Sequence, residues 1–149
     1  MVGLKKIKLQ KLEQVLFEPY GRILEPLERE VPEVTETGIF DFYVPFSVKS
    51  QGWQMGYLVN MTKSINKLER HPNTPEVFSP LSGKTVLVVS IKPEDPATIV
   101  SFALSKPIVF NCGVWHGVIT LSEESKVLIV ENPDVIDEFF ELPFRLTVI

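Results

Sequence analysis

The chain has 149 residues, of which 44% are hydrophobic and 23% charged, so we expect one soluble domain spanning residues 1–149. Its 15 basic and 19 acidic side chains give a net charge of −4. This acidic balance argues against nucleic acid as a partner, because nucleic-acid binders need a cationic surface. The single cysteine, Cys112, excludes an intrachain disulfide and a cysteine-based zinc site.

The N-terminal residues are rich in lysine and lack the apolar core of an export signal. No apolar run approaches the ~20 residues that a membrane-spanning helix needs. We therefore expect a cytoplasmic protein without a membrane partner.

Alternating apolar and polar residues predict short strands along most of the chain. A first strand is expected around Ile7 and Leu9, followed by one or two helical turns at residues 12–17. Residues 24–36 are rich in charge and proline, which predicts an exposed loop. Further strands are predicted at residues 40–44, 55–60, 65–71, 85–91, 99–104, 108–111, 114–121 and 127–131.

Two segments have a distinct pattern within this series. Residues 85–91 are almost continuously apolar, as in a strand buried on both faces, whereas residues 139–149 are ambiguous between a strand and an irregular tail. Eight or more short strands separated by turns indicate a β-sandwich or barrel. The expected fold is therefore all-β with little helix.

The two histidines, His71 and His116, are the main candidates for chemistry. In an extended segment Glu69 and His71 project from the same face, because strand side chains alternate. Glu76 follows a Pro-Asn-Thr-Pro corner and is expected to return on the neighbouring strand, facing the same side. Gly113 supplies a tight turn before the strand that His116 opens.

A face that carries Glu69, His71, Glu76 and His116 suits a divalent cation, since carboxylates and imidazoles bind zinc, manganese, nickel or iron. A lone histidine is more often a core or surface residue than a ligand. The combination favours the metal site, because two clustered glutamates repel each other and an anionic substrate adds a third negative charge.

The order of these residues resembles the two metal-ligand motifs of cupins, with Glu69 in the place of the usual first histidine. This resemblance implies a cupin-type double-stranded β-helix, or jelly-roll barrel. More closely, the chain resembles the ureidoglycolate lyase family, which has Gln at the position of Glu76. The matching stretches are Phe17-Glu18-Pro19-Tyr20-Gly21, Leu68-Glu69-Arg70-His71-Pro72, Phe78-Ser79-Pro80-Leu81-Ser82-Gly83 and Val114-Trp115-His116.

The family reaction splits ureidoglycolate into glyoxylate and urea, as part of allantoin degradation in purine catabolism. The resemblance thus implies a carbon–nitrogen lyase that acts on a small anionic metabolite. Glu69, His71 and His116 are the candidate catalytic residues, and Glu69, His71, Glu76 and His116 are the candidate metal ligands. Lys63 and Phe78 are candidates for substrate binding, and Lys67, like Lys63, could hold a carboxylate near the barrel mouth. A solvated lysine is the more usual outcome, and core packing explains Phe78 equally well.

Two alternatives to this function remain open from the sequence. One is a metal-dependent cupin that acts on another small hydroxy acid, keto acid or sugar; the other is a non-catalytic cupin that binds a small ligand. The resemblance also implies a homodimer. The aromatic residues Phe139, Phe140 and Phe144 are candidates for covering the partner's sheet edge.

Overall fold

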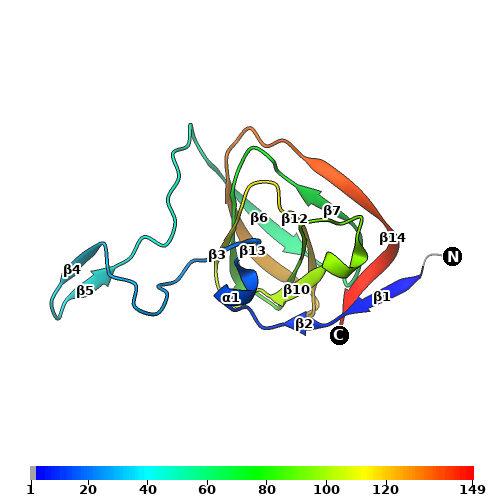
Figure 1. Ribbon diagram of the computed structural model, residues 1–149, viewed down its shortest axis with the longest axis horizontal. Coiled ribbons are helices and arrows are strands. Elements are labelled where there is room, and N and C mark those ends of the chain that lie inside the picture. The colour runs from blue at the N-terminus through cyan, green and yellow to red at the C-terminus, as the bar shows by residue number, and fades with distance from the viewer. Residues whose placement is uncertain (1–2) are drawn as a thin grey trace.

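Two β-sheets face each other and curl into a barrel in the computed structural model, which describes residues 3–149 (Figure 1). In spatial order, the seven-stranded sheet contains β1 (Leu4–Ile7), β14 (Glu138–Val148), β7 (Ile65–Arg70), β12 (Trp115–Thr120), β9 (Thr85–Ser90), β10 (Val100–Ala103) and β2 (Leu9–Gln10). The five-stranded sheet contains β3 (Gly21–Ile23), β11 (Ile108–Phe110), β8 (Glu76–Ser82), β13 (Ser125–Glu131) and β6 (Gln54–Asn60). Within residues 3–149, helical structure is limited to α1 (Gln14–Phe17) and a 3₁₀ turn, η1 (Pro96–Thr98), in agreement with the low helix content expected.

Strand β9 lies between two hydrophobic cores, and all six of its residues are buried. Leu87 and Val89 point into the core between the two sheets. Val86 and Val88 point into a second core on the other face of the seven-stranded sheet. The continuous apolar run in the sequence is thereby explained, because neither face of this strand meets solvent.

The second core is closed by the N-terminal segment. Strand β1 pairs with β14, and β2 pairs with β10, so residues 4–10 join the two ends of the seven-stranded sheet. Phe140 and Phe144 pack against this core within their own chain, whereas Phe139 is 55% exposed. Phe140 and Phe144 thus already pack within their own chain, and Phe139 is the most exposed of the three candidates for covering a partner.

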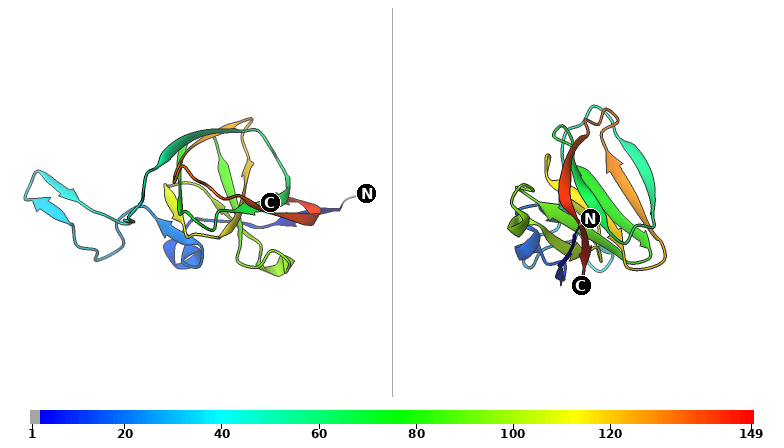
Figure 2. Two further views of the ribbon diagram at one scale, coloured as in Figure 1. Left: turned by 90° about the horizontal axis from the view of Figure 1, so that it is seen from above. Right: turned by 90° about the vertical axis from the view of Figure 1, so that its right-hand side faces the viewer.

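An arm formed by residues 24–53 extends away from the barrel and carries the hairpin β4 (Val34–Glu36) and β5 (Phe40–Phe42) near its tip (Figures 1 and 2). The predicted loop at residues 24–36 is thus only partly a loop, since its last three residues pair with β5. The ambiguous C-terminal segment is strand β14, with an irregularity between Glu141 and Leu146, where Pro143 cannot donate a ladder hydrogen bond.

Among the described residues, no helix is both long and apolar enough to span a bilayer.

Candidate metal centre

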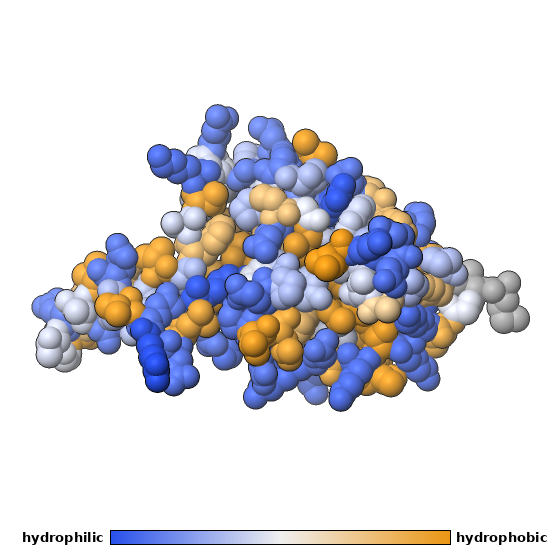
Figure 3. Space-filling view, viewed as in Figure 1, coloured by the Kyte–Doolittle hydropathy of each residue, from blue (hydrophilic) through white to orange (hydrophobic). Residues whose placement is uncertain are grey.

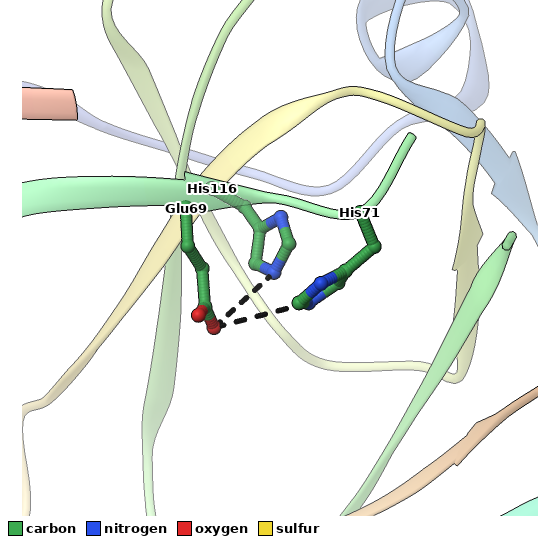
Figure 4. A group of neighbouring side chains, drawn as sticks. All are labelled: Glu69, His71 and His116. Carbon is green, nitrogen blue, oxygen red and sulfur yellow. Dashed lines mark ion pairs between the residues drawn. The ribbon is translucent and has the colours of Figure 1, made fainter. Parts of the chain in front are cut away.

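Glu69 and His116 are direct partners across the pairing of β7 with β12. Side chains at paired positions point to the same face of a sheet. Here that face is the interior of the barrel, where the ring of His116 stacks on Phe110 with centroids 4.8 Å apart and meets Phe78 edge-on. His71 follows the end of β7, and Figure 4 shows Glu69 reaching toward both imidazole rings.

Glu76 reaches the same place from the opposite sheet. The Pro72–Pro75 corner carries the chain from β7 across to β8, which pairs with β11 and β13 rather than with β7. The expectation that Glu76 lies on a strand neighbouring β7 is therefore wrong. Its carboxylate nevertheless meets the histidines, because the two sheets face each other at this point.

The four side chains form one compact cluster. The Nε2 atom of His116 lies 3.0 Å from Oε1 of Glu76, and the Nε2 atom of His71 lies 3.3 Å from Oε2 of Glu76. Oε1 of Glu69 lies 3.8 Å from Nε2 of His116 and 4.0 Å from Nε2 of His71. His71, Glu76 and His116 are buried, whereas the side chain of Glu69 is 40% exposed.

Backbone carbonyls fix the orientation of both rings. The Nδ1–H of His116 donates to the carbonyl oxygen of Val114 at 2.9 Å, and that of His71 donates to the carbonyl oxygen of Ile136 at 3.3 Å. A carbonyl oxygen can only accept, so Nδ1 carries a proton in both rings. In a neutral imidazole the lone pair is then on Nε2, which faces the carboxylates.

These donor atoms fit a divalent cation. Oε1 of Glu76 and Nε2 of His116 are buried and lie close together, yet neither makes a hydrogen bond of acceptable geometry. A tetrahedral zinc ion with bonds of about 2.0–2.1 Å holds its ligand atoms about 3.3 Å apart, close to the separations of 3.0 and 3.3 Å around Glu76. The Glu69, His71 and His116 donors also lie within 4.8 Å of one another.

Without a cation, the cluster shifts the pKa values of its members. Burial raises the pKa of Glu76. The close contacts with His116 and His71 and their positive charges outweigh this effect and hold the pKa of Glu76 well below its usual range. Burial lowers the pKa of His71, but the hydrogen bond and charge of Glu76 outweigh it and raise that pKa to about 9. The metal-free cluster therefore binds a proton on His71 at neutral pH.

A further carboxylate, Glu131 at the end of β13, lies against Glu76 and was not found from the sequence. Burial, followed by the hydrogen bond and charge of Glu76, raises the pKa of Glu131 to about 7. Its donor atoms lie within 4.8 Å of those of His71 and Glu76. No local spacing links Glu131 to the motif, because its position depends on the pairing of β13 with β8.

The cluster borders a cavity of about 450 Å³, to which it contributes Glu69 and His116. Apolar residues of β6, β7 and β12 line one part of this cavity, including Leu58, Ile65 and Val118. Its polar lining comprises Asn60, Thr62, Ser64, Asn66, Lys67 and Arg145. The cavity thus brings two cationic side chains next to the exposed side of the cluster of Glu69, His71, Glu76 and His116.

Of the residues considered for substrate binding, Lys63 and Phe78 do not line this cavity. The ammonium group of Lys63 donates to the carbonyl oxygen of Ser122, which holds it away from the cavity. Phe78 is 2% exposed and belongs to the core beneath His116. Lys67, which the sequence also offered as a contact for a carboxylate, does line the cavity, on the same strand face as Glu69. Arg145 lines it as well and was not found from the sequence.

Comparison with known proteins shows the family to which the chain belongs. The chain matches the family model described as ureidoglycolate lyase over residues 4–145. It is 24% identical to ureidoglycolate lyase 2 of Rhizobium meliloti over 94% of this chain and 96% of that protein. It is 26% identical to the ureidoglycolate lyase of Chelativorans sp. over 96% of this chain and 97% of that protein.

Among solved structures, the capsular polysaccharide assembling protein CapF from Staphylococcus aureus shares the fold, with a TM-score of 0.52 and 17% sequence identity. The match covers 62% of this chain and 27% of that longer chain. The cupin-type fold expected from the sequence is confirmed. Because the family model matches nearly the whole chain, this chain belongs to the ureidoglycolate lyase family.

Proposed function

We propose that this protein cleaves ureidoglycolate to glyoxylate and urea, with a divalent cation held by His71 and His116 together with the carboxylates of Glu69 and Glu76. One observation carries the proposal. Two imidazole Nε2 atoms and two carboxylates converge beside a cavity that also holds two cationic side chains. The family of the chain supplies the substrate and the class of reaction.

The residues fit the role of a cation site in their chemistry and their burial. His71, Glu76 and His116 form the buried part of the donor set, and Glu69 closes it on the cavity side. When bound, a divalent cation such as zinc, manganese, nickel or iron acidifies a coordinated hydroxyl group and neutralises the negative charge of the site.

The reaction breaks the C–N bond of a carbinolamine. A base takes the proton of the substrate hydroxyl group, the O–H electrons form the C=O bond of glyoxylate, and the C–N electrons go to the urea nitrogen. That nitrogen then takes a proton. Glu69 is the carboxylate of the cluster that lies on the cavity, so we assign it the transfer of this proton from oxygen to nitrogen.

Lys67 and Arg145 are the proposed contacts for the polar groups of the substrate. Lys67 lies on the same strand face as Glu69, and its ammonium group is 5.0 Å from the ring centre of Phe139 at the cavity wall. Arg145 is held by Ser64, whose Oγ and carbonyl oxygen accept from Nε and Nη2 at 2.9 and 3.0 Å. Both cations favour an anionic metabolite over a neutral sugar.

Release of urea and glyoxylate from ureidoglycolate tests the proposal directly. The metal-loaded protein should release both products in equal amounts, and the chelator-treated protein should lose this activity. Zinc, manganese, nickel and iron should then be compared for their ability to restore it. Metal uptake without product release would exclude this substrate while leaving the metal site in place.

The apolar part of the cavity favours one second candidate. Leu58, Ile65 and Val118 present hydrocarbon to the cavity. A hydroxy or keto acid with an apolar chain would bury that chain against these residues. Binding of such acids in preference to ureidoglycolate would favour this second function.

We further propose that two copies associate through the arm. Apolar side chains are exposed along it, with Ile39 73%, Phe42 54% and Trp53 64% exposed, and the space-filling view shows hydrophobic residues among the polar ones in this region (Figure 3). An isolated two-stranded hairpin is at best marginally stable in water, so the arm needs a surface to pack on.

A second copy of this chain is the occupant that the surface favours. The exposed apolar residues continue from the arm onto the edge strand β6, where Met55 and Tyr57 are 60% and 61% exposed. A two-fold axis would place each arm on the corresponding face of the other copy. Light scattering should give a dimer for the protein and a monomer for Phe42→Ser combined with Tyr57→Ser; a monomeric wild-type protein would contradict the proposal.

A further inference from the structure

Asp137 lies beside the part of His71 that faces away from the metal-ligand cluster. Its Oδ1 atom is 3.0 Å from Nδ1 of His71, closer than the carbonyl oxygen of Ile136 at 3.3 Å. His71 is therefore placed between two carboxylates, with Glu76 at Nε2 and Asp137 at Nδ1. His116 has no such carboxylate at Nδ1 within the described residues, where the carbonyl of Val114 takes this role.

The segment that carries Asp137 is fastened to the corner that follows His71. The backbone N–H of Ile136 donates to Oδ1 of Asn73 at 3.0 Å, and the side-chain amide of Asn73 donates to the carbonyl oxygen of Asp134. The N–H of Asn132 donates to Oγ1 of Thr74 at 3.0 Å. These contacts from the Pro72–Pro75 corner hold the 132–137 segment in register with the histidine.

We propose that Asp137 is a positioning residue that keeps the proton of His71 on Nδ1 and thereby directs the Nε2 lone pair toward the cation. The inference rests on the proposed metal site. A carboxylate behind a metal-binding histidine fixes its tautomer and ring orientation and increases its basicity. The hydrogen bond of Nδ1–H goes to the carbonyl oxygen of Ile136, and the half-exposed carboxylate of Asp137 adds a negative charge beside it, 3.0 Å from Nδ1.

The chain offers a matched control at the next position. Glu138 has the same charge and lies in the same segment, but it pairs with Arg70 at 3.0 Å on the outer face of the sheet. Removing its charge changes the net charge of the protein as much as a substitution at Asp137 does. The comparison therefore separates the specific contact with His71 from general electrostatics.

Zinc titration of the chelator-treated full-length protein by calorimetry tests the inference. Asp137→Ala should weaken zinc binding by about 10–100-fold. Asp137→Asn keeps an oxygen atom beside Nδ1 but loses the charge, so it should recover only part of this loss, and Glu138→Gln should bind zinc as the wild type does. Equal zinc affinities for Asp137→Ala and Glu138→Gln would overturn the inference.

A second readout needs neither metal nor activity. Nitrogen-15 NMR of the metal-free protein at pH 10, where the imidazole is neutral, reports which nitrogen of His71 carries the proton. The wild type should have the proton on Nδ1, and Asp137→Ala should populate both tautomers. An unchanged tautomer in Asp137→Ala would refute the positioning role, whereas a wild type that binds no zinc would refute the proposed metal site instead.

Discussion

Glu76 and His116 face each other from opposite sheets of the barrel, with Oε1 of the glutamate 3.0 Å from Nε2 of the histidine. One side chain belongs to β8 and the other to β12, and these strands share no ladder hydrogen bonds. The candidate site is therefore completed only when the two sheets dock. Any ligand that binds both residues also links the sheets.

The first prediction concerns stability. A divalent cation that binds the folded protein should stabilise it by about 2.7 kcal/mol at a free concentration 100 times its Kd, because the unfolded chain lacks the assembled site. Thermal unfolding should therefore move to higher temperature with added zinc and back with chelator. In His116→Ala the shift should be largely lost, whereas in Glu138→Gln it should remain.

The second prediction concerns catalysis. Glu69→Gln removes the proposed proton-transferring group but keeps its shape, so kcat should fall by about 10²–10⁴-fold. Arg70→Gln is the matched control, because the guanidinium of Arg70 lies outside the barrel over the ring of Trp115, 4.6 Å from its centre. Steady-state release of urea checks both variants. Equal activity in Glu69→Gln and Arg70→Gln would remove Glu69 from the mechanism.

The third prediction concerns pH in the metal-free protein. The raised pKa of His71, about 9, means that the folded state binds more protons than the unfolded state between the ordinary histidine pKa of 6.5 and that value. The free energy of unfolding should therefore decrease as pH rises through this range. Denaturant titrations of His71→Gln should lack this decrease. Retention of the full decrease in the variant would show that His71 does not bind the extra proton.

Glu131 also makes the free energy of unfolding decrease as pH rises, but over a lower pH range than His71 does. Its pKa is raised from 4.5 to about 7, so the folded carboxyl group retains a proton that the unfolded one has lost. Glu131→Gln should flatten the pH dependence between these values and leave the range above 7 unchanged. The same denaturant titrations measure it. Flattening above pH 7 instead would contradict the assignment of Glu131 to this range.

A further prediction concerns Gly21, which lies in the N-terminal stretch that resembles the ureidoglycolate lyase family. A Cβ atom at Gly21 would lie 1.9 Å from the carbonyl oxygen of Val109 on the paired strand β11. Backbone cannot move aside as a side chain does, so Gly21→Ala should reduce the free energy of unfolding by about 3 kcal/mol. Gly3→Ala, with no heavy atom within 4 Å of the added Cβ, is the control.

The sequence was sufficient to predict the strand content and to select the residues that come together. The alternation of Glu69 with Arg70 placed the former inside and the latter outside, because strand side chains alternate. Burial of β9 followed from its apolar run. The side-chain alternation and the apolar content of a strand are local properties, so both can be predicted from the sequence.

Other features depend on contacts that local patterns do not encode. Glu131 and Asp137 reach the neighbourhood of His71 through strand pairing and loop contacts over more than fifty residues of chain. Phe78 was predicted to bind substrate from its spacing, but the docking of the sheets places it in the core. An exposed loop was expected at residues 24–36, but its continuation to residue 53 as an arm was not, because the apolar residues that follow look like those of ordinary core strands.

An anomalous difference map from crystals of the metal-loaded protein tests the central claim most directly. We predict one strong peak bound by Nε2 of His71, Nε2 of His116 and carboxylate oxygens of Glu69 and Glu76. Absence of a peak at full metal concentration, with both imidazoles paired directly to the glutamates, would contradict the account.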